Sequence, residues 1–159
     1  MFARLFATTP KITINNTDIK NLDVDTIDKL KQSPHNKFQL TNMAMHDAYT
    51  ENNIDKLKYL NNNFGLRLPT LGCYHVDVSI EEGNDNMAKF LVTDFKCAPS
   101  LYAKQMSQIN GHTDLVTWVD ANSIQRNDIG IQNIHGRYDL KTKQWRWDSW
   151  VPEQFRVFQ

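Results

Sequence analysis

The chain has 159 residues and equal numbers of basic and acidic side chains, 18 Lys+Arg and 18 Asp+Glu, so its formal net charge is zero. This balance argues against a tail that coats nucleic acid non-specifically. No apolar run reaches the ~18 residues of a membrane span, and the N-terminal stretch lacks the apolar core and cleavage site of a signal peptide. We therefore expect a cytoplasmic protein in which Cys73 and Cys97 are reduced, half-buried thiols.

The length predicts a single domain, 1–159, with three parts. Residues 1–36 are expected to form an N-terminal arm with a short helix, residues 37–120 an α/β core, and residues 121–159 a β-rich extension. A chain of this size can bury roughly 68–70% of its unfolded surface, so the core needs no disulfide or metal to hold it together.

Helix signals dominate the first third of the chain. Asp23 or Asp25 can cap a short helix over residues 26–32, with its apolar side chains directed inward. Helical spacing of apolar residues then extends over 38–62, where Glu51-Asn52-Asn53 favours a break and Asn53 can cap the second helix. Residues 47–65 resemble one ankyrin-like helix pair, but a single pair without neighbours cannot bury its apolar face, so this interpretation is set aside.

The middle of the chain contains short apolar runs between turn residues, which are typical of strands. Pro99-Ser100 begins a helix that continues to about Ile109 and that Gly111 ends. The predicted strands are Gly65–Gly72, Tyr74–Ile80, Ala88–Phe95, 114–120 and 128–134.

The order of elements from residue 40 to 120 is therefore α-β-β-β-α-β. Antiparallel strands mixed with crossover helices predict an α/β (α+β) fold with a central mixed sheet flanked by helices. A C-terminal β-hairpin around residues 141–143 is expected to complete it.

Two carboxylates and a lysine lie on the two central predicted strands. Strand side chains alternate, so Asp94 and Lys96 share one face, about 7 Å apart. If the strands pair so that Asp77 lies opposite Asp94, all three side chains gather on that face. A shift of one residue would direct Asp77 and Asp94 to opposite faces and remove the site.

This element order, with the pattern Asp77…Asp94-x-Lys96, resembles the PD-(D/E)XK nuclease superfamily over about half of the chain. The resemblance implies that Asp77 and Asp94 hold Mg²⁺ or Mn²⁺ and that Lys96 positions the attacking water. The pattern departs from the family because no proline precedes Asp77 and because Asp94 stands where Glu is commoner. Asp85, in the predicted turn, is an alternative first ligand.

The same resemblance implies two further roles on the flanking helices. Glu51 or Asp47 would match the acidic residue that many members carry before the sheet, and Gln105 or Gln108 would touch DNA. A simpler interpretation competes with it, because Asp-x-Lys after an apolar strand is common by chance. Asp94 and Lys96 would then form a structural ion pair, with Asp77 on a solvated face.

The C-terminal segment interleaves basic and aromatic residues, a composition that suits phosphate contact and base stacking or, equally, a protein partner. The hypothesis from sequence is a metal-dependent DNA endonuclease, and a homodimer is expected because two DNA strands need two sites. The alternative is a non-catalytic protein-binding domain, such as an inhibitor, immunity or phage accessory protein, that uses this hairpin. The contact candidates here are Arg137, Lys141, Lys143, Trp145 and Arg146.

Overall fold

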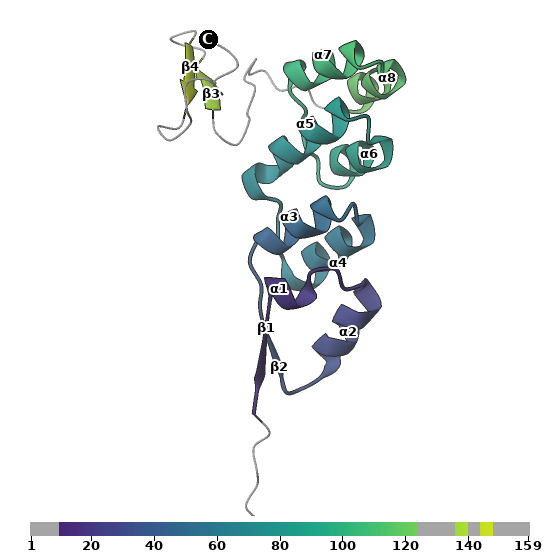
Figure 1. Ribbon diagram of the computed structural model, residues 1–159. Helices are drawn as coiled ribbons and strands as arrows, with labels where there is room; N and C mark the ends of the chain where they lie inside the picture. The colour runs from purple at the N-terminus through teal and green to yellow at the C-terminus, as the bar shows by residue number, and fades with distance from the viewer. Residues whose placement is uncertain (1–9, 124–135, 140–143, 148–159) are drawn as a thin grey trace, which may run out of the picture. The chain divides into compact units, whose positions relative to one another are not determined.

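The computed structural model describes residues 10–123, 136–139 and 144–147 (Figure 1). The chain divides into two compact units, residues 1–69 and 70–159, so the division falls inside the segment 37–120 that was predicted to form one core. Among the described residues, no helix has both the length and the apolar character needed to cross a membrane.

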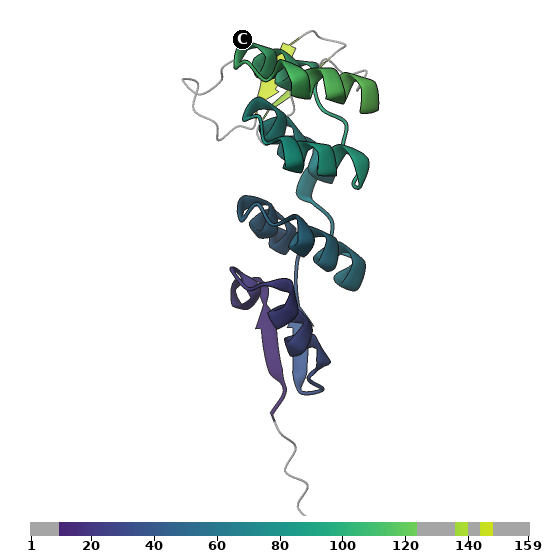
Figure 2. The same cartoon turned by 90° about the vertical axis from the view of Figure 1, so that its right-hand side faces the viewer.

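The first unit contains a two-stranded parallel sheet and four helices. Strands β1 and β2 lie side by side with Ile14 opposite Phe38 (Figure 2), while α1 packs on α3 and α2 packs on α4. The unit therefore consists of two successive helix pairs with a small sheet. Its elements are β1 (Ile12–Asn15), α1 (Asn16–Ile19), α2 (Val24–Gln32), β2 (Asn36–Gln39), α3 (Met43–Thr50) and α4 (Ile54–Phe64).

The starts of these helices follow from capping side chains in the sequence. Asp23 caps α2 by accepting from the Thr26 backbone N–H at 2.7 Å, and Asn53 caps α4 by accepting from the Lys56 N–H at 2.9 Å. Each bond satisfies a backbone donor that has no partner within its own helix. The predicted caps at Asp23 and Asn53, and the predicted break before Asn53, are confirmed.

The second unit contains two helix pairs and a two-stranded antiparallel sheet. Helix α5 packs on α7, and α6 packs on α8, as both views show (Figures 1 and 2). In the sheet, Gly136 of β3 lies opposite Trp147 of β4. The elements are α5 (Cys73–Glu81), α6 (Asp85–Thr93), α7 (Leu101–Ile109), α8 (Thr113–Asn122), β3 (Gly136–Asp139) and β4 (Gln144–Trp147), and a 3₁₀ turn (Pro69–Gly72) precedes α5.

The mixed helix and strand content agrees with an α+β protein, but the predicted strands of the core are wrong. Tyr74–Ile80 and Ala88–Phe95 lie largely in α5 and α6, residues 114–120 lie in α8, and Gly65–Gly72 forms no strand. The described residues contain only two-stranded sheets and no central mixed sheet. Apolar runs of four to eight residues fit a buried helix as well as a strand, and helix packing decided the outcome here. The strand predicted at 128–134 lies outside the described residues.

One backbone feature recurs along the described chain. Asn21, Asn52, Gly83 and Gly111 all have positive φ, between +53° and +89°, and they follow one another at intervals of 31, 31 and 28 residues. Each lies in the short loop between the two helices of a pair, where a left-handed residue ends the first helix. Residues 16–122 therefore repeat one helix–loop–helix unit four times.

The last three pairs bury the same positions relative to the left-handed residue. Apart from His75, the first-helix positions carry the short side chains of Ala or Ser, which allow close packing; apart from Ala88, the second-helix positions carry larger side chains that fill the core. Eight positions before the left-handed residue lie Ala44, His75 and Ala103, and four positions before it lie Ala48, Ser79 and Ser107. After the left-handed residue, the second helix buries three positions. Four positions after it lie Lys56, Met87 and Leu115; five positions after it lie Leu57, Ala88 and Val116; eight positions after it lie Leu60, Leu91 and Val119.

Candidate functional site

Asp77, the first predicted metal ligand, lies in α5 and is buried. Its Oδ1 accepts a hydrogen bond of 2.7 Å from the backbone N–H of Ser100, and the Ser100 hydroxyl in turn accepts from the Ala103 N–H at 3.1 Å. Ser100 is the N-cap of α7. Asp77 therefore fixes the start of α7 against α5, which is a structural task.

Asp94 and Lys96 follow α6 rather than ending a strand. Asp94 is the exposed C-cap residue and accepts from the Thr93 hydroxyl at 2.8 Å, while Lys96 is exposed with φ of +55°. The predicted facing of Asp77 and Asp94 across two strands is therefore wrong, because both segments are helical. Asp85, the alternative ligand, pairs with Lys89 at 2.7 Å. Within the described part of the chain, no three His, Cys, Asp or Glu side chains form a group that could hold a metal ion.

Glu51, the predicted acidic helix residue, is the C-cap of α3 and links two helix pairs of the first unit. Its Oε2 lies 2.8 Å from the ammonium of Lys56, and its Oε1 accepts from the Asn21 backbone N–H at 3.0 Å. The Lys56 ammonium also donates to the Ile19 carbonyl at 2.8 Å. Lys56 is 1% exposed, so this ion pair compensates for the cost of burying its charge.

The predicted contact residues are placed only in part. Gln105 and Gln108 are exposed on α7, while Asp47 of α3 lies 3.9 Å from the Lys20 ammonium. Arg137, Trp145 and Arg146 fall in β3 and β4, and Lys141 and Lys143 between them, but these side chains lie outside the described residues. Both cysteines are free thiols, Cys73 half-buried and Cys97 buried.

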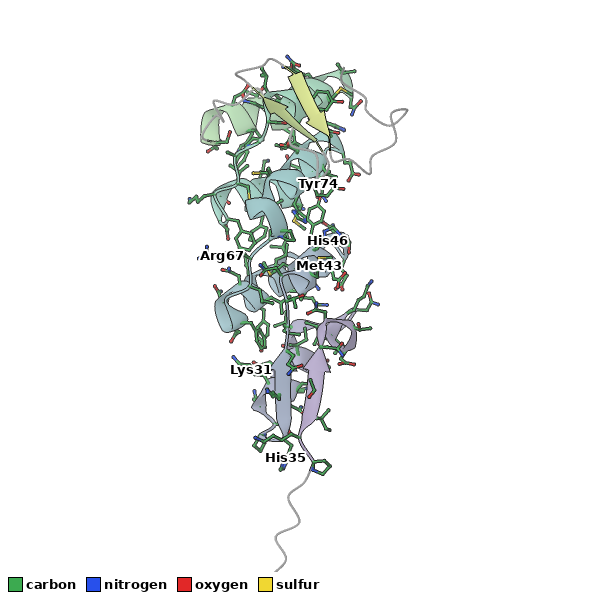
Figure 3. The ribbon with its side chains drawn as sticks, turned by 90° about the vertical axis from the view of Figure 1, so that its left-hand side faces the viewer. Lys31, His35, Met43, His46, Arg67 and Tyr74 are labelled. Atoms are coloured by element: carbon green, nitrogen blue, oxygen red, sulfur yellow. The ribbon has the colours of Figure 1, made fainter. Side chains whose placement is uncertain are left out.

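Within each unit, the first helices of the last three pairs carry exposed or half-buried apolar and aromatic side chains. Nine positions before the left-handed residue stand Met43, Tyr74 and Tyr102, of which Met43 is 52% exposed and the tyrosines are half-buried. Figure 3 labels Met43 on α3 and Tyr74 on α5. On α7, Ile109 is 75% exposed and lies seven residues after Tyr102, on the same side of the helix.

In the second unit these residues form a surface that we call the α5–α7 face: Tyr74 and Glu81 of α5, with Tyr102, Gln105 and Ile109 of α7. The two helices are in contact. The side-chain amide of Asn110 donates to the Glu81 carbonyl at 3.1 Å, which brings the C-terminal ends of the helices together. Glu81 and Ile109 therefore lie at the same end of the face.

The α5–α7 face is electrostatically negative around Glu81. Partial burial raises the pKa of the Glu81 carboxyl, and the negative charges of Asp77 and Glu82 raise it further. Burial, and after it the charge of Glu81, raises the pKa of the Tyr102 phenol. The face thus combines the apolar side chain of Ile109, the aromatic ring of Tyr102 and the carboxylate of Glu81, which lies in a negative environment.

A cleft of about 280 Å³ opens in the first unit between the N-termini of α2 and α4. Asp23 and Asn53 in its wall cap these helices, and hydrogen bonds from Thr26 lower the pKa of Asp23. Carboxylates near helix N-termini also stabilise the helix dipole. Capping therefore accounts for this cleft. Its lining is Asp23, Val24, Asp25, Asn53 and Asp55.

Comparison of the chain with protein-family models, curated proteins and solved structures finds no match. Inferences about its function therefore rest on the residues of the chain itself. Sequence reasoning named Gln105 but missed Glu81, Tyr102 and Ile109. The signal that could have found them is the spacing of Asn52, Gly83 and Gly111, which sets the repeat.

Proposed function

We propose that the chain is a short array of ankyrin-like helix pairs that binds a protein partner without catalysing a reaction. The repeat intervals of 31, 31 and 28 residues support this, because they lie close to the ankyrin period of about 33 residues. Stacked helix pairs present extended surfaces that such proteins use for binding. The objection that one pair cannot bury its apolar face no longer applies, since each unit contains two pairs that pack on each other.

The observation that carries the proposal is the composition of the α5–α7 face. Ile109 exposes 75% of its surface, where the equivalent residues of the two preceding pairs are Thr50 and Glu81. Tyr102 lies two turns earlier on the same side of α7, and Tyr and other aromatic residues are enriched at the centres of protein interfaces. This favours partner binding on α5 and α7 rather than on the Trp-rich C-terminal strands of the sequence-based alternative.

The proposal can be tested by selecting ligands from a random peptide library displayed on phage against the full chain. Selected peptides are expected to bind the parent, and a variant with Tyr102→Ala and Ile109→Ser is expected to bind them at least tenfold more weakly, about 1.4 kcal/mol. The matched control is Ile12→Ser, which removes an exposed isoleucine from β1 and should leave binding unchanged. The proposal would be contradicted if no peptide were selected, or if the Tyr102→Ala and Ile109→Ser variant bound the peptides as tightly as the parent.

Plasmid nicking separates this function from the nuclease hypothesis. With Mg²⁺ or Mn²⁺ present, we expect the parent to leave supercoiled DNA intact, because Asp77 is engaged with Ser100 and the predicted strand pair is absent. Nicking that disappears in both Asp94→Ala and Lys96→Ala would favour the nuclease instead. Circular dichroism of each variant checks that the helices are retained.

A further inference from the structure

The helical part of the second unit carries an excess of negative charge. Residues 73–123 contain seven Asp or Glu and three Lys, with no Arg, which gives a formal charge of −4. Two of these lysines are already engaged, Lys89 with Asp85 and Lys104 with Asp120, each at 2.7 Å. Residues 10–69 contain eight basic and seven acidic side chains and are nearly balanced by comparison. The negative excess is therefore a property of the part that carries the α5–α7 face.

Glu81 is the residue on this face to which a cation would be attracted most strongly. It is the last residue of α5, at the negative end of the helix dipole, and it is half-buried near Asp77 and Glu82. Among the described residues, no lysine or histidine forms an ion pair with it. A carboxylate in such surroundings is stabilised when a positive charge approaches, because like charges and partial burial both disfavour its ionised form.

An apolar side chain accompanies this carboxylate. Ile109 is exposed and precedes Asn110, whose amide binds the Glu81 carbonyl, so the isoleucine lies beside the end of α5. Lysine and arginine combine an apolar stem with a charged tip, and they can cover an apolar surface while the charge reaches a carboxylate. Ile109 and Glu81 together therefore match the two parts of one basic side chain.

We propose that the α5–α7 face binds a partner segment that presents a lysine or arginine next to an apolar side chain. The basic group approaches Glu81, and the apolar group covers Ile109 and Tyr102. The inference rests on the proposed partner-binding function and adds the chemistry of the partner. Electrostatic attraction between a negative face and a basic segment also makes the association faster at low salt.

The peptides selected on the full chain provide the probe. They are expected to be enriched in Lys or Arg adjacent to an apolar residue, and the tightest one should lose at least tenfold in affinity when its basic residues are replaced by Gln. Glu81→Lys should weaken its binding by at least tenfold. The control Asp114→Lys makes the same change in charge at an exposed site on α8 and should leave the affinity within about twofold. Fluorescence anisotropy at low and high salt measures these affinities.

The outcomes separate the two proposals. Selected peptides that lack basic residues, or that bind Glu81→Lys as tightly as the parent, overturn the inference. If those same peptides still fail to bind the Tyr102→Ala and Ile109→Ser variant, the proposed function stands without it. If no peptide is selected, both are overturned.

Discussion

The two units build similar helix pairs but fill one equivalent buried position with different chemistry. Four positions after the left-handed residue, the first unit buries Lys56, whereas the second unit buries Met87 and Leu115. The lysine is compatible with this position because Glu51 and the Ile19 carbonyl both bind its ammonium. In the last three pairs a long side chain fills this position, and a charge on it is tolerated only when partners are supplied.

The two units also differ in the left-handed residue of the loop between the helices of a pair. Asn52 reaches a φ of +53° in the first unit, and Gly83 reaches +69° in the second. At Gly83 the ring of His112, from the next loop, occupies the place where a Cβ would stand. Asparagine adopts the left-handed region at a modest cost, but only glycine leaves room for this ring. Contact with a neighbouring loop thus decides the residue type at Gly83.

The largest expected effect comes from breaking the buried ion pair. Lys56→Ala should lower the free energy of unfolding by about 3–5 kcal/mol, because it leaves Glu51 and the Ile19 carbonyl without their donor and opens a cavity. Lys56→Met copies the second unit and should cost less, about 1–3 kcal/mol, since only the polar contacts are lost. Urea denaturation of both variants measures the difference, and equal losses would show that the apolar stem of Lys56 contributes nothing.

A smaller effect is expected at the glycines of the second unit. Gly111→Ala has space for its methyl group and should cost only the left-handed strain, about 1 kcal/mol. Gly83→Ala must also displace the His112 ring and should cost about 2 kcal/mol. Thermal unfolding of the two variants gives the comparison. In a His112→Ala background the two costs should become similar, and a difference that persists there would show that the ring is not its cause.

The smallest effect concerns pH and Glu81. Its raised pKa means that the folded state binds a proton more readily than the unfolded state, so its contribution to stability falls as the pH rises from about its ordinary value of 4.5 through the folded value. Glu81→Gln should therefore raise stability at neutral pH relative to the parent and remove this part of the pH dependence. Denaturation of the parent and of Glu81→Gln at pH 4 and pH 7 tests the sign of this effect. A Gln variant that is less stable than the parent only at neutral pH would contradict the prediction.

Several local features of the fold were predictable from single residues. The caps at Asp23 and Asn53, the break at Glu51-Asn52-Asn53 and the helix between Ser100 and Gly111 all agree with the structure. These signals work because the side chain and the backbone group that it satisfies are close in sequence.

The candidate site could not be found in the same way. Tyr74–Ile80 and Met87–Lys96 are short and apolar, and Val76, Val78 and Val92 favour strands by propensity. The turn-rich residues between them suit a hairpin as well as a helix pair. Side chains alternate every two residues in a strand but about every 3.6 in a helix. As a strand residue, Asp77 would share an open face with Asp94, whereas in the helix α5 it lies on the buried side.

The sequence by itself determined where α2, α4 and α7 begin, since a capping side chain acts within a few positions. It also contained the repeat intervals, which identify the helix pairs once Asn52, Gly83 and Gly111 are recognised as equivalent. Only the tertiary structure decided that the apolar runs are helices packed in pairs, and that Glu81 meets Tyr102 and Ile109 on one face. Burial against neighbouring helices, which depends on residues about 30 positions away, outweighed local strand propensity.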